Sequence, residues 1–245
     1  MYNAFARFYD AFTQNVNYPA RADYFAALIE KYGTGKGILL DLACGTGSLS
    51  FEMEKRGFDV IGTDSSTEML DEAMAKKIEH ASDTIFLNQD MTELDMFGTV
   101  TSTVCALDSL NHLDCAEKVR LVFSKVALFT EPGGVFIFDV NTRYKHRKLL
   151  ADNAFIFENE DCFLAWQNER LEDDSVNMYL DIFVPAGDKY ERESECITEY
   201  YYSDEVLGDA LELAGFELCA VYDDLSLEAP HETSERKVFV ARKLA

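Results

Sequence analysis

Short apolar runs alternate with amphipathic segments along most of this chain, and that alternation constrains the fold more than any other feature. Strands are predicted at the apolar runs 37–44, 59–64, 84–90, 101–108, 135–141, 216–224 and 236–243. Helices are predicted between them, with apolar residues at helical spacing, at 48–57, 67–80, 116–129 and 203–215. Strands that alternate with helices favour a mostly parallel sheet covered on both faces. We therefore expect a doubly wound α/β protein with a seven-stranded sheet, organised as a single domain over residues 1–245.

The segment 149–202 breaks this pattern. Its residues alternate in polarity with a period of two, and the turn-like sequences EDD and PAGDK interrupt them. Such a pattern is typical of antiparallel strands. We expect an antiparallel β insertion after the fifth strand, after which Ser203 and Gly215 are placed to begin and end a helix.

Charge excludes several classes of partner. The chain has 45 acidic and 22 basic residues and a net charge of −23, which repels phosphate backbones and anionic membrane surfaces. Its one basic cluster, Arg143–Lys148, is predicted to be a solvated loop face. We therefore expect neither a nucleic-acid partner nor a membrane partner.

Cysteine and histidine usage indicates a cytoplasmic protein without a metal. The six cysteines contain no C-x-x-C pair, which favours reduced thiols, and neither a secretory signal nor a long apolar span is recognisable. The four histidines, His80, His112, His146 and His231, lack ligand spacing with one another or with cysteine. No metal site is expected.

The stretch ILLDLACGTGSLS, residues 38–50, places a glycine-rich turn between the first strand and the following helix. Glycines there let backbone amides approach a ligand closely. A Walker loop is excluded because Gly-Lys-Ser/Thr is missing, and a dinucleotide fingerprint is only partly met because Ser50 stands where its third glycine belongs. Asp41 suits a ligand with positive charge, such as S-adenosylmethionine with its sulfonium and ammonium groups. Asp64, at the end of the second strand, is placed for ribose hydroxyls, which both kinds of ligand carry.

Four segments in order, LLDLACGTGSLS, VIGTDSSTEML, LNQDM and CALDSLNHL, resemble the successive motifs of class I S-adenosylmethionine-dependent methyltransferases. The resemblance covers most of the chain outside the insertion. It implies the seven-stranded fold of that family, with S-adenosyl-L-methionine as methyl donor and S-adenosyl-L-homocysteine as product. The sequence departs from the family pattern at Ala43, where a glycine is usual.

The resemblance also implies which residues bind the donor. They follow the first four predicted strands and are Asp41, Ala43, Gly45, Gly47, Asp64, Ser65, Met69, Asp90, Met91, Leu107 and Asp108. Asp41 and the two glycines would surround the methionine part, and Asp64 the ribose. Asp90 would meet the adenine amino group and Met91 would pack on its ring. Leu107 and Asp108 would close the pocket near the sulfonium, while Ser65 and Met69 line it.

The acids also have purely structural interpretations. Asp41 could cap the helix that begins near Gly47, Asp64 and Ser65 could cap the next helix, and Asp90 could be a turn residue. As a set they favour ligand binding, because each falls just past the carboxyl end of a predicted strand, where open parallel sheets bind ligands.

Two residues are candidates for catalysis. His112 follows the fourth strand in DSLNHL, and a neutral imidazole there suits a general base; its alternative is to cap or pack the following helix. The opening FARFYDAF resembles the segment that covers the donor in many small-molecule members of the family, so a lid helix is expected at 1–32. Tyr9 on it would orient an acceptor amine or the donor carboxylate, or else belong to an apolar helix face with Phe5 and Phe8.

The expected acceptor is a small molecule with a nitrogen or oxygen nucleophile. The Asn/Asp-Pro-Pro-Tyr motif of methyltransferases that modify nucleic-acid amino groups and glutamine is missing after the fourth strand. A protein side chain is the alternative acceptor, and a nicotinamide-dependent oxidoreductase or a donor-binding protein without catalysis are the alternative functions. The insertion is expected to shape the acceptor pocket or to form a homodimer contact. Trp166 lies in it and either lines that pocket or packs in the core or an interface, and the run Glu199–Tyr202 is equally ambiguous.

Overall fold

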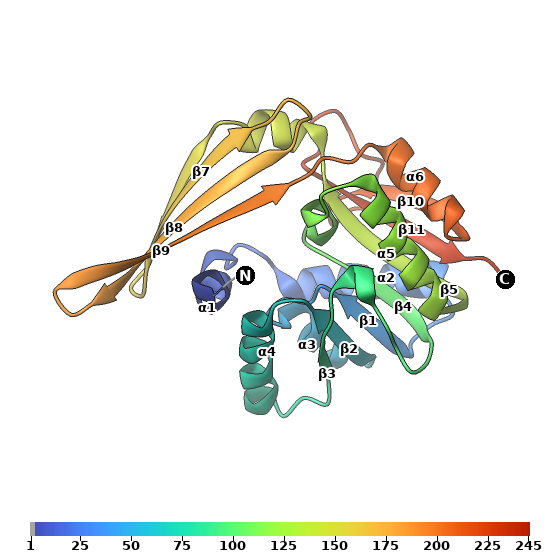
Figure 1. Ribbon diagram of the computed structural model, residues 1–245. Helices are drawn as coiled ribbons and strands as arrows, with labels where there is room; N and C mark the ends of the chain where they lie inside the picture. The colour runs from blue at the N-terminus through green and yellow to red at the C-terminus, as the bar shows by residue number, and fades with distance from the viewer. Residues whose placement is uncertain (1–2) are drawn as a thin grey trace.

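Seven strands form the central sheet of the protein, whose computed structural model describes residues 3–245, with side chains from residue 6 onward (Figure 1). Their spatial order is β10, β11, β5, β4, β1, β2 and β3. Their bounds are β1 (Ile38–Leu42), β2 (Asp59–Asp64), β3 (Ile85–Asn88), β4 (Val100–Cys105), β5 (Thr130–Asn141), β10 (Phe216–Asp223) and β11 (Arg236–Lys243). Neighbouring strands are parallel, except that β11 runs antiparallel to β5 and β10. The predicted doubly wound, mostly parallel seven-stranded sheet is confirmed.

Helices cover both faces of this sheet. The longer ones beyond the amino-terminal segment are α3 (Ser48–Lys55), α4 (Thr67–His80), α5 (Ala116–Phe129) and α6 (Asp204–Leu213). Three short helices, η1 (Met91–Glu93), η2 (Ser109–His112) and η3 (Lys145–Leu150), follow strand ends. Side-chain caps set two of the starts: Ser66 Oγ accepts the Met69 N–H before α4, and Ser203 Oγ accepts the Val206 N–H before α6.

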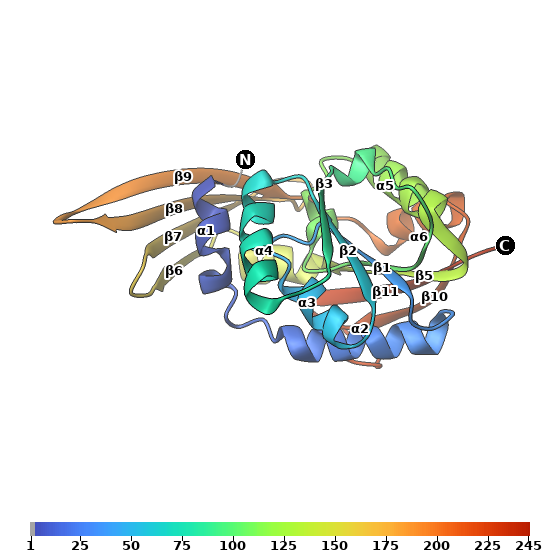
Figure 2. The ribbon, with the colours of Figure 1, turned by 90° about the horizontal axis from the view of Figure 1, so that it is seen from below.

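The sequence of β1 explains how the helices on both faces of the sheet pack against it. Leu39 packs in the core shared with α3, whereas Leu40 and Leu42 pack in the core shared with α5 and α6. Side chains alternate across a strand, so consecutive leucines serve opposite faces, and burial of each contributes about 1.5–3 kcal/mol. The view in Figure 2 shows α3 on one side of the sheet, with α5 and α6 on the other.

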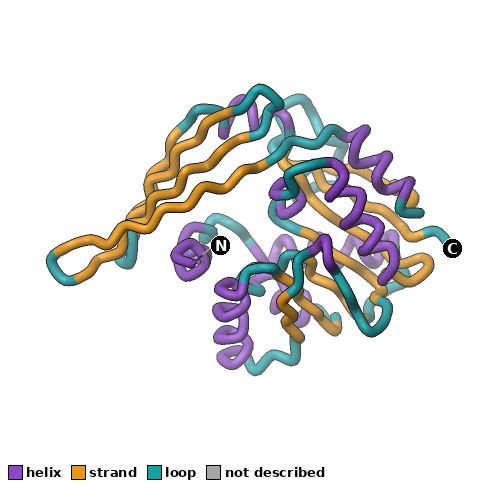
Figure 3. Tube along the Cα trace, viewed as in Figure 1, coloured by secondary structure: helices purple, strands orange, loops and turns teal. Residues whose placement is uncertain are grey.

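A second sheet of four antiparallel strands follows β5. It consists of β6 (Ala154–Glu158), β7 (Phe163–Arg170), β8 (Val176–Ala186) and β9 (Lys189–Glu199), paired in chain order. Figure 3 shows its strands side by side, leading away from the central sheet. Both the antiparallel pairing and the position of the insertion agree with the sequence expectation.

The amino-terminal segment differs from the single lid helix expected at 1–32. It forms two helices, α1 (Asn3–Phe12) and α2 (Tyr18–Tyr32), while residues 1–2 lie outside the described part of the chain. Asn17 caps α2 by accepting the Ala20 N–H, and Pro19 occupies its first turn, where proline favours a helix start. Helix α2 buries Phe25 and Leu28 in the sheet core. Of the two helices, α1 lines the cavity described below, and its role as a lid stays a prediction.

The basic cluster Arg143–Lys148 is less of a solvated loop than expected. Part of it forms η3, and the guanidinium groups of Arg143 and Arg147 bind Asp174 at 2.8 and 2.6 Å. The Asp174 side chain is 2% exposed, whereas both arginines remain about half exposed. This ion-pair cluster ties the insertion to the end of β5. Within residues 3–245, no helix is both long and apolar enough to cross a membrane.

Candidate active site

A cavity of about 400 Å³ lies at the carboxyl ends of the parallel strands, between α1 and one face of the insertion. Its lining includes these predicted site residues: Tyr9, Ala43, Gly45, Asp64, Ser65, Met69, Met91, Leu107, Asp108 and His112. An adjoining recess of about 40 Å³ shares Tyr9, Ala43, Gly45 and Leu107 and reaches Asp41. Open parallel sheets bind ligands at this end. The fold thus gathers most of the predicted residues around one space.

The two glycines of the loop do different things. Gly45 has φ +54°, and a Cβ added there would meet no atom within 4 Å, so its backbone borders open space. Its N–H donates to Asp64 Oδ2 at 2.8 Å. Gly47 has φ +74°, lines neither cavity, and leaves only 2.8 Å between an added Cβ and the Phe86 ring. Gly45 is therefore suited to a close ligand, and Gly47 to packing.

Asp41 is a buried acid held by one hydroxyl. Its side chain accepts a hydrogen bond of 2.5 Å from Ser50 Oγ, and the two residues are 2% and 0% exposed. Burial, opposed by the Ser50 hydrogen bond and aided by the charge of Asp64, raises the pKa of Asp41 to about 7. Asp41 does not cap α3, whose N-cap is Gly47. Ser50, where the dinucleotide pattern has glycine, is thus a partner of Asp41 that sequence reasoning missed.

Replacing Asp41 with asparagine should stabilise the protein at high pH. A pKa raised on folding means that the folded protein keeps a proton that the unfolded chain releases, so stability falls as pH rises from about 4 toward 7. Asparagine does not titrate and avoids that loss. Urea unfolding should show a gain about 2 kcal/mol larger near pH 8 than near pH 5.5, because one pKa unit corresponds to about 1.4 kcal/mol. An equal gain in stability at both pH values would contradict the raised pKa of Asp41.

Asp64 lies beside Gly45 at the end of β2. Its two carboxylate oxygens accept the backbone N–H groups of Ser66 and Gly45, each at 2.8 Å. Burial raises its pKa, against the lowering effect of these hydrogen bonds. The side chain that caps α4 belongs to Ser66 rather than to Asp64 or Ser65. Asp64 therefore holds the glycine loop in place and borders the cavity.

Asp90 and Met91 separate in the structure. Met91 lines the cavity, but Asp90 does not. Asp90 Oδ1 accepts the Thr92 N–H at 2.8 Å and the Thr92 hydroxyl at 2.6 Å, which caps η1. Asp90 thus stabilises the turn at the start of η1, while its contact with adenine stays a prediction.

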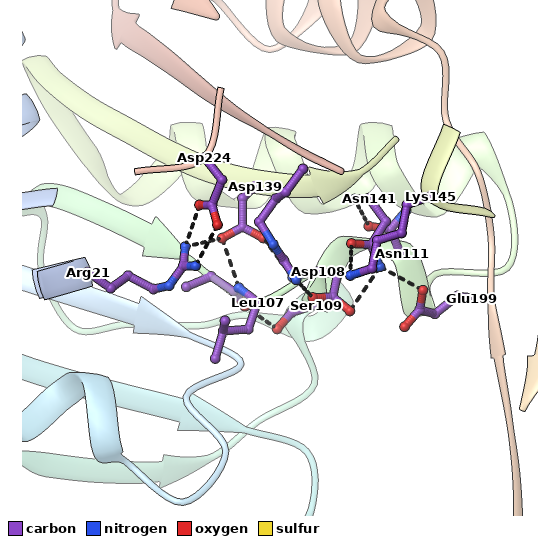
Figure 4. Close-up of polar contacts among 12 residues, drawn as sticks. Arg21, Leu107, Asp108, Ser109, Asn111, Asp139, Asn141, Lys145, Glu199 and Asp224 are labelled. Carbon is purple, nitrogen blue, oxygen red and sulfur yellow. Dashed lines mark hydrogen bonds and ion pairs between the residues drawn. The ribbon is translucent and has the colours of Figure 1, made fainter. Parts of the chain in front are cut away.

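Leu107 and Asp108 carry the chain past the end of β4 in a left-handed conformation, each with φ +57°. Two consecutive residues of this kind are strained for side chains other than glycine. Asp139, fully buried on β5, holds them, because its carboxylate oxygens accept the Leu107 N–H at 2.9 Å and the Asp108 N–H at 2.8 Å (Figure 4). Sequence reasoning missed Asp139, although an acid near the carboxyl end of the apolar run VFIFDVN was a usable signal.

Two arginines pair with the three acids around this turn, which are Asp108, Asp139 and Asp224. Arg236 pairs with both Asp108 and Asp139, and Arg21 binds Asp224 at 2.9 Å in a forked contact. Burial alone would raise the pKa of Asp108, but the Arg236 charge holds it far below its usual value. Asp108 is therefore ionised, and it shares the Arg236 guanidinium with Asp139.

His112 ends η2 and faces the cavity, so it is exposed to solvent there although protein atoms crowd its other sides. Burial lowers its pKa, against the charges of Asp108 and Asp64 and a hydrogen bond to the Thr198 backbone. A neutral ring with one nitrogen bonded to the backbone leaves the other nitrogen as a proton acceptor. The N-cap of α5 is Cys115, so His112 does not cap that helix.

Tyr9 lines both cavities, and burial raises its pKa well above the usual value. Its neighbour Phe8 lines neither cavity and packs with the insertion, while the Phe5 side chain is outside the described part. Asp10 fastens α1 to the glycine loop, because it accepts the Thr46 hydroxyl at 2.7 Å and pairs with Lys76. Helix α1 thus joins the insertion to the glycine loop.

The insertion contributes two side chains that were not among the predicted site residues. Trp166 and Glu199 both line the cavity. Glu199 Oε2 accepts Asn141 Nδ2 at 2.8 Å and lies 3.7 Å from His146 Nε2, a buried nitrogen without a hydrogen-bond partner among the described residues. Burial, and then the charge of Asp108, raises the pKa of Glu199 to about 8. Within residues 3–245, no group of three His, Cys, Asp or Glu is placed to hold a metal ion.

Comparisons with known proteins point in one direction. Residues 39–134 match the family model described as a methyltransferase domain. A protein of Geobacillus sp. (strain WCH70), whose methyltransferase assignment is itself provisional, is 35% identical over 245 residues, which cover 99% of both chains. A dTDP-amino-sugar N,N-dimethyltransferase of Streptomyces venezuelae is 30% identical over 122 residues, about half of each chain. The crystal structure of an S-adenosylmethionine-dependent methyltransferase from Clostridium acetobutylicum superimposes with a TM-score of 0.89 at 28% identity and covers 100% of this chain and 99% of that one.

Proposed function

The chain belongs to the class I S-adenosylmethionine-dependent methyltransferases, and from this premise we propose that it methylates a nitrogen or oxygen atom of a small molecule. The observation that carries the proposal is the cavity, which joins the strand-end loops to the face of the insertion and is bordered by α1. A site walled on three sides suits a small acceptor better than a folded protein.

Acidic side chains and one open glycine fit the donor. S-adenosylmethionine supplies a methyl group on a positively charged sulfur, so that the acceptor's lone pair forms a bond to carbon as the carbon–sulfur bond breaks and its electron pair stays on sulfur. We propose that Asp41 and Asp64 hold the cationic and ribose parts beside Gly45. Ser65, Met69 and Met91 line the remaining wall on the donor side. Burial makes such carboxylates effective partners for a cation.

We assign His112 and Tyr9 to the acceptor. We propose that His112 takes the proton that the nucleophile loses, which is supported by its lowered pKa and by its position on the cavity lining. Tyr9 is placed to orient the acceptor or the donor carboxylate with its phenol. Helix α1, fastened through Asp10, would help to exclude water during transfer.

A product-release screen tests the proposed function. The protein is incubated with S-adenosylmethionine and pools of metabolites or peptides, and the S-adenosylhomocysteine formed is converted by its hydrolase to homocysteine for detection. We expect turnover with a metabolite pool. Turnover only with peptides would favour a protein side chain as acceptor, and tight donor binding without turnover in any pool would indicate a binding protein.

Replacing Asp64 with alanine should weaken binding of S-adenosylhomocysteine. Loss of hydrogen bonds to a charged group typically costs about 1.5–3 kcal/mol, or about 10- to 150-fold in affinity. Calorimetry measures the change, and Asp59→Ala, an exposed acid at the opposite end of the same strand, is the matched control. Unchanged affinity in a folded Asp64→Ala variant would contradict the ribose assignment.

Cytoplasmic location and a homodimer through the insertion remain part of the proposal. The six cysteines are free thiols, as a reducing compartment requires. Two large apolar side chains of the insertion, Ile156 and Tyr190, are 69% and 66% exposed, which supports a contact between copies.

A further inference from the structure

The inner face of the insertion is an apolar wall of the cavity. Its lining side chains are Phe157, Leu164, Trp166, Met178, Leu180 and Ile197. The strand register makes them one surface, because Phe157 is opposite Leu164, Trp166 is opposite Leu180, and Met178 is opposite Ile197. The one hydrogen-bonding group among these side chains, the Trp166 indole N–H, already donates to Asn168 Oδ1. The part of the acceptor that lies there must be apolar.

One carboxyl group ends this wall. Glu199 follows Ile197 by two residues on β9 and therefore shares its face. Its side chain is nearly buried, at 7% exposure, and borders the cavity together with Asp108 and His112. Asn141 Nδ2 bridges Asp108 and Glu199, at 3.1 Å and 2.8 Å from their oxygens. The apolar wall thus leads directly to two adjacent carboxyl groups beside the proposed base.

The charges around the cavity are unfavourable for an anion. Arg236 is the only arginine or lysine among the described residues that line it, and Asp108 and Asp139 already pair with that guanidinium. Asp64 adds a further acid on the donor side. Lys145 lies behind the lining, where its Nζ donates to Asn141 Oδ1 at 2.8 Å and its charge acts on Asp108 and Glu199, but it does not border the cavity. A carboxylate or phosphate brought here would lose water and meet only the already paired Arg236, whereas an ammonium group would find carboxyl oxygens.

We propose that the acceptor is an amine with an apolar body and no anionic group next to its nitrogen, held by Glu199 and Asp108 at the nitrogen and by the inner face of the insertion along its body. The inference rests on the proposed function and specifies its acceptor. The ammonium gives a proton to His112, the freed lone pair forms the new nitrogen–carbon bond, and the electron pair of the broken carbon–sulfur bond stays on sulfur. Burial and the Asp108 charge raise the pKa of Glu199 to about 8 in the empty site, and an ammonium beside both carboxyl groups lowers it again, so that the ionised pair holds the cation. Glu199 is in this account the residue that selects a cationic acceptor.

Trp166 provides a direct readout of acceptor binding. It is the only tryptophan of the chain and it lines the cavity, so its fluorescence should respond to a ligand on the apolar wall. Phenethylamine, phenylalanine and ethanolamine are titrated into the full chain in the presence of S-adenosylhomocysteine. Phenylalanine adds one carboxylate to phenethylamine, and ethanolamine lacks the apolar body.

We expect phenethylamine to bind at least about tenfold more tightly than either analogue. Equal or tighter binding of phenylalanine, or no response to phenethylamine up to about 10 mM, would overturn the acceptor assignment. Binding of S-adenosylhomocysteine itself is measured separately by calorimetry. Its absence would instead overturn the proposed function, so the two failures are distinguishable.

A pair of variants tests the role of Glu199. Glu199→Gln keeps the shape and the contact with Asn141 but cannot ionise beside the bound ammonium, and it should weaken phenethylamine binding at least about tenfold with donor-product affinity unchanged. Glu193→Gln, an exposed acid on the same strand, is the control and should change neither. Unchanged amine affinity in Glu199→Gln would remove Glu199 from acceptor binding, whereas equal loss of both affinities would indicate a structural role and also contradict the assignment.

Discussion

His112→Ala should slow methyl transfer about 10²- to 10⁴-fold with the acceptor found in the screen, while the affinity for S-adenosylhomocysteine stays the same. The imidazole borders the cavity, burial keeps it neutral, and its ring is fixed by the Thr198 backbone. Removing it takes away the group that accepts the proton of the nucleophile but leaves the donor side intact. Single-turnover kinetics measure the transfer step, and calorimetry measures the affinity.

The pH profile separates catalysis from structure in this variant. In the wild type, the rate should fall on acidification as His112 becomes protonated, and this limb should be missing in His112→Ala. His231→Ala is the control, because that histidine is 62% exposed and lies outside the cavity lining. A parallel loss of rate and donor affinity, with the acid limb retained, would show that His112 is structural.

Asp139→Asn should destabilise the protein by about 3–5 kcal/mol, which is the usual result of removing one partner from a buried ion pair. Asp139 is fully buried, pairs with Arg236 and holds the left-handed turn at Leu107 and Asp108. An amide has the same shape but cannot balance the arginine or accept hydrogen bonds on both of its terminal atoms. Urea unfolding gives the change in free energy of unfolding.

Asp224→Asn is the matched control for that experiment. Asp224 binds Arg21 at 2.9 Å as part of the same charge network, but its side chain is 28% exposed. Water compensates for a lost ion pair at such a position, so the change should stay within about 1 kcal/mol. Similar effects of the two substitutions would contradict the view that the Asp139 carboxylate, rather than the network in general, holds the turn.

Local signals in the sequence predicted the elements that build the sheet. The bounds of α4, α5, β2 and β11 match the predicted ones, because apolar periodicity defines each segment and its ends coincide with caps or turns. The lid was mispredicted as one helix, although Asn17 and Pro19 together signal a helix start. The single helix followed from the resemblance of FARFYDAF to the covering segment of small-molecule members of the family, which does not specify where a second helix begins.

The residues of the candidate site also fall into two groups, those that the sequence predicted and those that only the structure revealed. Asp41, Asp64 and Asp108 were predicted because each lies next to a strand end, a feature that sequence shows directly. Arg236 and Glu199 were not, since their places depend on the pairing of segments far apart in the chain: Arg236 meets Asp139 across 97 residues and Glu199 meets Asn141 across 58. No periodicity specifies which strands become neighbours at the sheet centre or how an insertion folds back over it. The residues on the acceptor side of the cavity could therefore be identified only from the structure.

Calorimetric titration of the wild-type chain with S-adenosylhomocysteine and, separately, with NAD tests the central claim most directly. The account predicts saturable binding of S-adenosylhomocysteine, one molecule per chain, and no binding of NAD, because acids and an open glycine line the donor side of the cavity. Saturable binding of NAD without binding of S-adenosylhomocysteine would contradict it.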